Sequence, residues 1–130
     1  MTRGILDTSV IIDLRIVDAS KLPDEPARTA ITLAELSDGP AAAKDPIERA
    51  ARMADLQDVE HRFEPIAFDD HAARRYGQLA ALVRAAGRAH RPRRLDLMIA
   101  SIASVAGLPL YTRNPDDFIG LETMLRVVAV

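Results

Sequence analysis

The sequence predicts an α/β domain with a mainly parallel central sheet. Short runs of aliphatic and β-branched residues alternate with longer segments whose apolar residues recur at helical spacing. Strands that alternate with helices pair in parallel, because each helix carries the chain back to the start of the next strand. Hydrophobic residues make up 48% of the 130 residues, enough for a real core. We therefore expect one domain spanning residues 1–130.

Five strands and five helices are predicted in chain order. The strands fall at residues 3–6, 29–31, 63–68, 108–111 and 126–130. The helices, with their capping residues, fall at residues 8–16, 32–39, 45–62, 69–87 and 95–106.

The first strand is a short apolar run at Arg3–Leu6. A helix beginning at Thr8 or Ser9 and ending at Ile16 follows, because its apolar residues have helical spacing. The prolines of residues 18–26 then predict a loop.

Residues 29–31 contain β-branched Thr and Ile, which favour a second strand. Thr32 and Glu35 have the spacing of a capping box, which predicts that a helix begins there. Gly39 and Pro40 are expected to end this helix.

Two longer helices follow. Pro46 suits the first position of a helix capped by Asp45, and Asp69 or Asp70 caps the next one. Between them, residues 63–68 alternate weakly between apolar and polar side chains, which indicates a strand.

The last part of the chain opens with a basic loop at residues 88–94. An apolar-periodic helix follows it, and Gly107 ends that helix. The strand at 108–111, the polar turn at 113–118 and the strand at 126–130 complete the fold.

The composition excludes several kinds of site. The chain has no cysteine, so disulfides, thiolate metal sites and cysteine nucleophiles are excluded, and a reducing cytoplasm is compatible. No apolar stretch approaches the ~20 residues of a membrane span, and no signal peptide is evident. Lys21 and Lys44 are the only lysines. That bias reflects either genomic base composition or a use of arginine for bidentate phosphate contacts.

Acidic residues follow several of the predicted strands. Asp7 ends the first strand, Glu35 and Asp96 lie in the first turns of two helices, and an acidic turn at 114–117 follows a later strand. In a parallel sheet, these places converge at one edge. Carboxylates without cysteine favour a hard cation such as Mg²⁺ or Mn²⁺. Each acid also has a local interpretation, as a helix cap, a favourable charge at a helix N-terminus or a turn residue.

Arginines flank two of these acidic segments. Arg91, Arg93 and Arg94 precede Asp96, and Arg113 precedes the acidic turn. Such arginines are suited to bind phosphate groups on either side of the acids. The alternative is a solvated basic loop.

Several motifs together resemble a known family. They are ILDTSVIIDL at 5–14, AITLAEL at 30–36, RLDLMIASIASVAGLPLYTRNPDDF at 94–118 and the closing apolar strand. In this order they resemble the PIN-domain ribonucleases, and more narrowly the VapC toxins of bacterial type II toxin–antitoxin systems. The segment between Glu35 and Asp96 carries no family motif.

The resemblance implies a three-layer α/β/α sandwich and a set of site residues. The family's acids match Asp7, Glu35, Asp96 and Asp117, with Asp116 as a substitute for Asp117. The matching polar companions are Ser9, Thr112 and Asn114.

The implied activity is divalent-metal-dependent endoribonuclease cleavage by a cytoplasmic toxin. Asp7 and Asp96 would be the principal ligands of Mg²⁺ or Mn²⁺, and Glu35 or the ion itself would activate the attacking water. The implied partners are an RNA substrate, a VapB-like antitoxin that places an arginine in the acidic pocket, and a second copy of the chain.

Two other functions remain open from the residues alone. A receiver-type signalling domain would need a lysine after a late strand, and neither lysine is there. A PIN-like module that binds RNA or protein without catalysis would keep the fold, although retention of every acid argues against it.

Overall fold

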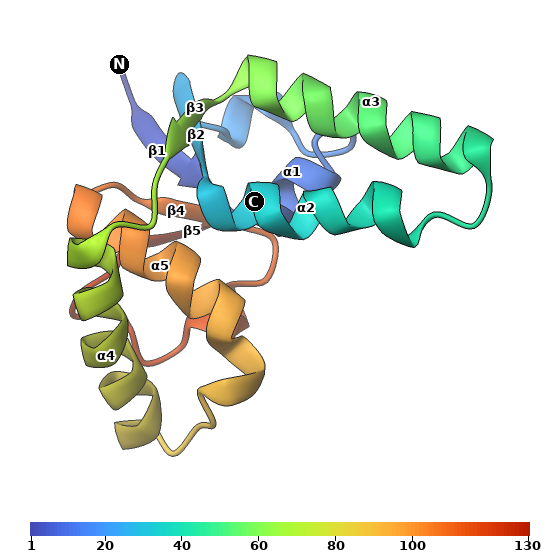
Figure 1. Cartoon of the computed structure of the whole chain (residues 1–130). Helices are drawn as coiled ribbons and strands as arrows, with labels where there is room; N and C mark the ends of the chain where they lie inside the picture. Colours follow the sequence, from blue (N-terminus) through green and yellow to red (C-terminus); the bar gives the residue numbers. More distant parts are fainter.

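The computed structural model describes all 130 residues and contains a five-stranded sheet with helices on both of its faces (Figure 1). The strands are β1 (Arg3–Leu6), β2 (Glu25–Thr29), β3 (Glu64–Ile66), β4 (Leu110–Thr112) and β5 (Val127–Ala129). The helices are α1 (Thr8–Ile12), α2 (Ala30–Ala42), α3 (Pro46–Arg62), α4 (Asp70–Ala85) and α5 (Arg94–Ala106). Short 3-10 turns lie at Ala19–Lys21, Arg91–Arg93 and Pro115–Phe118.

All strand pairs in the sheet are parallel, and the strand order is β3-β2-β1-β4-β5. The first strand is therefore central: Ile5 lies opposite Ala27 of β2 on one side and Leu110 of β4 on the other. Because the strands run in one direction, their carboxyl ends meet at a single edge. The predicted α/β class and parallel sheet are confirmed.

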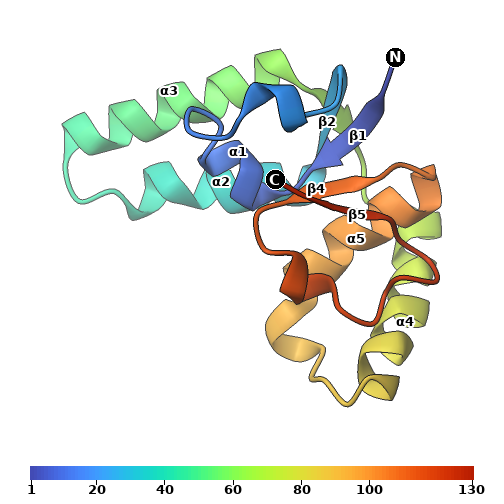
Figure 2. The ribbon, with the colours of Figure 1, turned by 180° about the vertical axis from the view of Figure 1, so that it is seen from behind.

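Two hydrophobic clusters, one on each face of the sheet, complete a three-layer arrangement. Ile5 packs in a cluster with α4 and α5, whereas its neighbour Leu6 packs with α1, α3 and Tyr111. Alternate residues of a strand point to opposite faces, so β1 serves both cores. The α2–α3 and α4–α5 hairpins lie on different sides of the molecule in both views (Figures 1 and 2).

The second strand was expected at 29–31 but occupies residues 25–29, and α2 begins at Ala30. Thr29, rather than Thr32, caps the helix: its Oγ1 accepts the Thr32 amide hydrogen at 3.2 Å. Pro26 is tolerated inside the strand because β3 pairs with β2 only from Ala27 onward. Pro26 has no amide hydrogen, but the sheet loses no hydrogen bond because no residue of β3 lies beside it to accept one.

The predicted end of α2 was also wrong, since the helix continues through Gly39 and Pro40 to Ala42. Arginines of α3 bind carbonyl oxygens in the last turn of α2. Arg52 donates to the Gly39 carbonyl at 2.8 Å, and Arg49 donates to the Pro40 carbonyl at 3.4 Å. These contacts stabilise a helix end that local propensity disfavours.

The first helix is shorter than predicted and ends at Ile12 instead of Ile16. Val10 and Ile11 are its buried residues, whereas Ile16 is 72% exposed. A continuation would bury little apolar surface, and burial is what stabilises short helices.

The remaining helices begin close to where they were predicted. The carboxylates of Asp45 and Asp69 accept amide hydrogens from Glu48 at 2.8 Å and Ala72 at 2.9 Å, as N-caps. The last two strands start one or two residues later than expected. None of the helices is long and apolar enough to cross a membrane.

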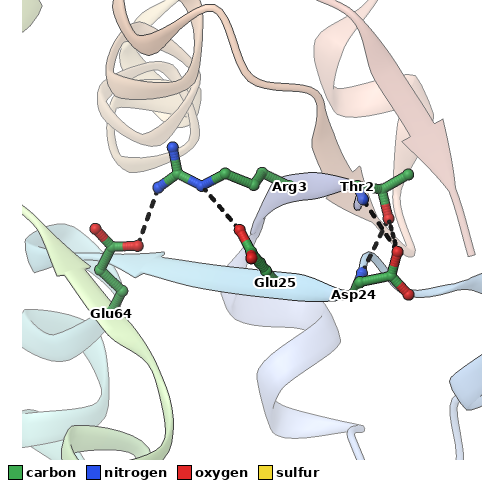
Figure 3. Close-up of polar contacts among 5 residues, drawn as sticks. All are labelled: Thr2, Arg3, Asp24, Glu25 and Glu64. Carbon is green, nitrogen blue, oxygen red and sulfur yellow. Dashed lines mark hydrogen bonds and ion pairs between the residues drawn. The ribbon is translucent and has the colours of Figure 1, made fainter.

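An exposed polar network joins the amino ends of the first three strands (Figure 3). The Arg3 guanidinium lies 3.0 Å from a Glu64 carboxylate oxygen and 3.6 Å from one of Glu25. Asp24 accepts hydrogen bonds from the amide and hydroxyl of Thr2, both at 3.0 Å. This network stabilises the edge of the sheet formed by the amino ends of the strands, which is opposite the carboxyl edge where Asp7 lies.

Candidate active site

Asp7 follows β1 directly and is only 4% exposed. One of its carboxylate oxygens accepts the Val10 amide hydrogen at 3.2 Å and also the Ser9 hydroxyl hydrogen. Asp7 is therefore the N-cap of α1, as one interpretation of the sequence had it. Asp7 can cap the helix and also belong to the site, because the capping hydrogen bonds hold its carboxylate at the carboxyl end of the central strand.

Asp96 lies in the first turn of α5, and its pKa is raised to about 6. Burial is the largest cause, followed by repulsion from the carboxylates of Asp117, Asp7 and Glu35. Arg93 acts in the opposite direction. The fold thus gathers three acids, which are far apart in the sequence, around the half-buried carboxyl group of Asp96.

The structure separates the two neighbouring acids of the late turn. Asp117 is partly buried, and its charge is the strongest of those that raise the Asp96 pKa. Asp116 is exposed and is absent from those charges, and its backbone carbonyl accepts a hydrogen bond from Arg88 at 2.8 Å.

Two of the expected polar companions also lie at this edge. Thr112 is fully buried, and its hydroxyl accepts the Asn114 amide hydrogen at 2.9 Å. The side chain of Asn114 is on the exposed side of the turn.

Glu35 is held by hydroxyl groups that the sequence did not single out. Thr8 donates a hydrogen bond to Glu35 Oε1 at 2.8 Å, and Thr32 Oγ1 lies 3.0 Å from Thr8 Oγ1. Both threonines lie in the first turn of a helix that follows a strand, which is the signal that could have identified them. Because Thr29 caps α2, Glu35 is not the second arm of a capping box.

Ser9 and Arg113 form a bridge between the first and fourth strands. The Ser9 hydroxyl bonds to Asp7 and accepts the Arg113 amide hydrogen at 3.1 Å. The Arg113 guanidinium pairs with Asp13 at 2.9 Å. This arginine is therefore partly neutralised, unlike those before α5.

A cleft of about 530 Å³ passes beside the acids. It is lined by Glu35, Asp96, Arg91, Arg94, Pro92, Leu95 and Met98. Acidic and basic side chains thus line the same cleft. Arg93 is the N-cap residue of α5, and its Nε is buried without a hydrogen-bond partner.

The donor set suits a hard divalent cation. No three acidic or histidine side chains already stand close enough together to form a ready-made cage. However, all four side chains offer oxygen ligands, and their mutual repulsion at Asp96 is what a cation would neutralise. The residues therefore fit Mg²⁺ or Mn²⁺ in chemistry and charge.

A parallel sheet that gathers four acids at its carboxyl edge defines a PIN domain. The PIN domain family model matches residues 5–121, and the chain belongs to this family. The chain is also 41% identical to Ribonuclease VapC5 of Mycobacterium tuberculosis over 122 residues, which cover 92% of this chain and 87% of that protein. The family suggested by the sequence motifs is thereby confirmed.

Solved structures agree with this assignment. VapBC-5 from Mycobacterium tuberculosis, a member of the VapBC family of toxin–antitoxin systems, superposes with a TM-score of 0.86 at 37% identity over 100% of both chains. DNA-bound VapBC from Salmonella typhimurium has a TM-score of 0.78 at 24% identity, covering 99% of this chain and 98% of the other, and shares the fold.

Proposed function

We propose that this chain is a divalent-metal-dependent endoribonuclease that acts as the toxin of a VapBC-type pair. The observation that carries the proposal is the Asp96 carboxyl group, whose pKa is raised by burial and by three other acids. Perturbed carboxyls grouped at a cleft are typical of a catalytic site. The similarity to a VapC ribonuclease supports the reaction and the biological role.

Asp7 and Asp96 are the proposed principal metal ligands, and Glu35 and Asp117 complete the site directly or through water. When bound, Mg²⁺ or Mn²⁺ lowers the pKa of water and neutralises charge that develops on the phosphate. Asp117 is preferred to Asp116 because its charge acts on Asp96. Ser9 and Thr112 hold the local backbone by accepting the amide hydrogens of Arg113 and Asn114, and Asn114 is the third proposed polar companion.

The chain's own residues supply the other requirements of phosphodiester hydrolysis. Glu35 is placed to accept a proton from the attacking water, because it faces the cleft next to Asp96. Arg91 and Arg94 line the same cleft and are placed to bind RNA phosphates. Arg93, which precedes α5, and Arg113, which follows β4, are proposed as further phosphate-binding residues.

An antitoxin partner is part of the proposal. A groove of about 240 Å³ between α1, α2 and α3 is lined mainly by apolar side chains, among them Ile12, Leu36 and Phe63. Such a groove suits an apolar segment of a VapB-like protein. The solved VapBC complexes support this pairing. We further propose that residues 1–130 act as one domain, that the chain forms a homodimer, and that it works in the cytoplasm.

The test is cleavage of end-labelled structured RNA by the purified protein in Mg²⁺, Mn²⁺ or EDTA. Discrete cleavage should require metal and disappear in Asp7→Asn and Asp96→Asn, while Asp38→Asn, on an exposed face of α2, should cleave normally. Cleavage that persists at the wild-type rate in both variants would mean that these acids do not catalyse it, and would contradict the proposal. RNA binding without cleavage would favour a non-catalytic PIN-like module.

A further inference from the structure

Thr32 is a buried polar residue for which neither the fold nor the proposed reaction has an assigned use. It lies in the first turn of α2 with no exposed surface. Its amide hydrogen bonds to Thr29 Oγ1, but its hydroxyl points across to Thr8 of α1, 3.0 Å away. A buried hydroxyl that reaches another helix specifies how the two helices meet.

The direction of these hydrogen bonds follows from the groups themselves. An ionised carboxylate only accepts hydrogen bonds, and a hydroxyl has a single hydrogen to donate. Thr8 gives its hydrogen to Glu35 Oε1 at 2.8 Å, so Thr32 must donate to Thr8. The result is a one-way chain from Thr32 through Thr8 to Glu35.

We propose that Thr32 is a positioning residue that acts through Thr8 to hold the Glu35 carboxylate in the cleft. The proposal rests on the function proposed above. Thr8 directly follows Asp7 in the chain. The hydrogen bonds between the hydroxyls therefore also set the distance between Asp7 and Glu35. Oε1 of Glu35 is engaged, which leaves the second carboxylate oxygen for the metal or the attacking water.

A glutamate side chain has several rotatable bonds, and ordering it costs conformational entropy when a ligand binds. The hydroxyls of Thr8 and Thr32 order the Glu35 side chain before a metal ion binds. Their loss should weaken metal binding by about 10-fold, the lower end of what partners of metal ligands contribute.

The experiment measures Mn²⁺ binding to the full chain by electron paramagnetic resonance, with RNA cleavage measured in parallel. Thr32→Val, which keeps the side-chain volume and removes the hydroxyl, should bind Mn²⁺ about 10-fold more weakly. Thr32→Ser should bind like the wild type. Ser101→Ala removes another fully buried hydroxyl, on α5, and controls for a general loss of stability.

Action through Glu35 is tested in the Glu35→Gln background. There, adding Thr32→Val should change Mn²⁺ affinity no further, because the group that it positions has already been altered. An equal loss in both backgrounds would overturn the proposal, as would a Thr32→Val protein that binds like the wild type. A wild-type protein that neither binds Mn²⁺ nor cleaves RNA would instead overturn the proposed function.

Discussion

Tyr111 covers the bare α-carbon of Gly4 on the same face of the sheet. A β-carbon built on Gly4 would overlap the Tyr111 ring and would also stand 3.3 Å from Pro23 Cγ. The ring is 9% exposed and belongs to the cluster formed with Leu6. Glycine at this position is therefore required by packing, not by an unusual backbone conformation.

We predict that Gly4→Ala lowers the free energy of unfolding by about 1–3 kcal/mol, because the ring must move out of a packed core. Gly77→Ala is the matched control. Gly77 lies inside α4 with open space around it, so alanine there should stabilise the protein by ~0.5–1 kcal/mol. Urea denaturation checks both values, and effects of the same sign would contradict the packing explanation.

The raised Asp96 pKa predicts an unusual pH dependence of stability in the absence of metal. The pKa of Asp96 in the folded chain is about 6, whereas an ordinary aspartate carboxyl has a pKa of 3.8. Between these two pH values the folded state binds more protons than the unfolded state. The free energy of unfolding therefore falls as the pH rises, and this decrease is complete above about pH 6.

Asp96→Asn should therefore stabilise the metal-free protein at pH 7.5. A gain of about 1 kcal/mol is expected after allowance for solvent screening, or ~4 °C in Tm. At pH 4 the gain should shrink. Thermal melts in EDTA at both pH values measure this effect, and an equal loss of Tm at both would show that Asp96 has a purely structural role.

Asp117 and Asp116 should differ sharply as asparagine variants. Asp117→Asn removes the charge that acts most strongly on Asp96, so Mn²⁺ affinity and RNA cleavage should each fall by about 10-fold or more. Asp116→Asn leaves the backbone contact with Arg88 in place and should keep both. Loss of cleavage in Asp116→Asn alone would reverse this assignment.

Arg91 and Arg94 should carry much of the salt dependence of RNA binding. Replacing both by alanine should reduce the slope of log K against log salt by about 1.4, since each phosphate contact to a single strand contributes ~0.7. Arg113→Ala should change the slope less, because Asp13 already neutralises that guanidinium. Arg74→Ala, on the outer surface of α4, is the control. Filter binding between 50 and 200 mM salt, about the range in which such contacts dominate, measures the slopes.

The fold class and the grouping of the candidate acids were predictable because they depend on short-range patterns. A short apolar run placed β1, capping residues placed the starts of α3 and α4, and apolar periodicity placed α5. Parallel pairing then required Asp7 and Asp96 to end at one edge of the sheet.

The errors came from contacts between distant segments. The extension of α2 past Pro40 is supported by Arg52 of the next helix, which donates to the Gly39 carbonyl 13 residues away along the chain. Likewise, Thr32 resembled an N-cap in sequence but is an interior residue whose hydroxyl bonds to Thr8. Local preference cannot reveal a partner that only tertiary structure supplies.

Because β1 is the central strand, the candidate site can form only late in the synthesis of the chain. Leu6 emerges from the ribosome early, but its neighbour in β4, Tyr111, follows more than a hundred codons later. Asp117 comes later still. Until then, the nascent polypeptide has Asp7 but lacks both the strand that fixes it and the acid that completes its surroundings. A partly translated chain therefore lacks the complete candidate site.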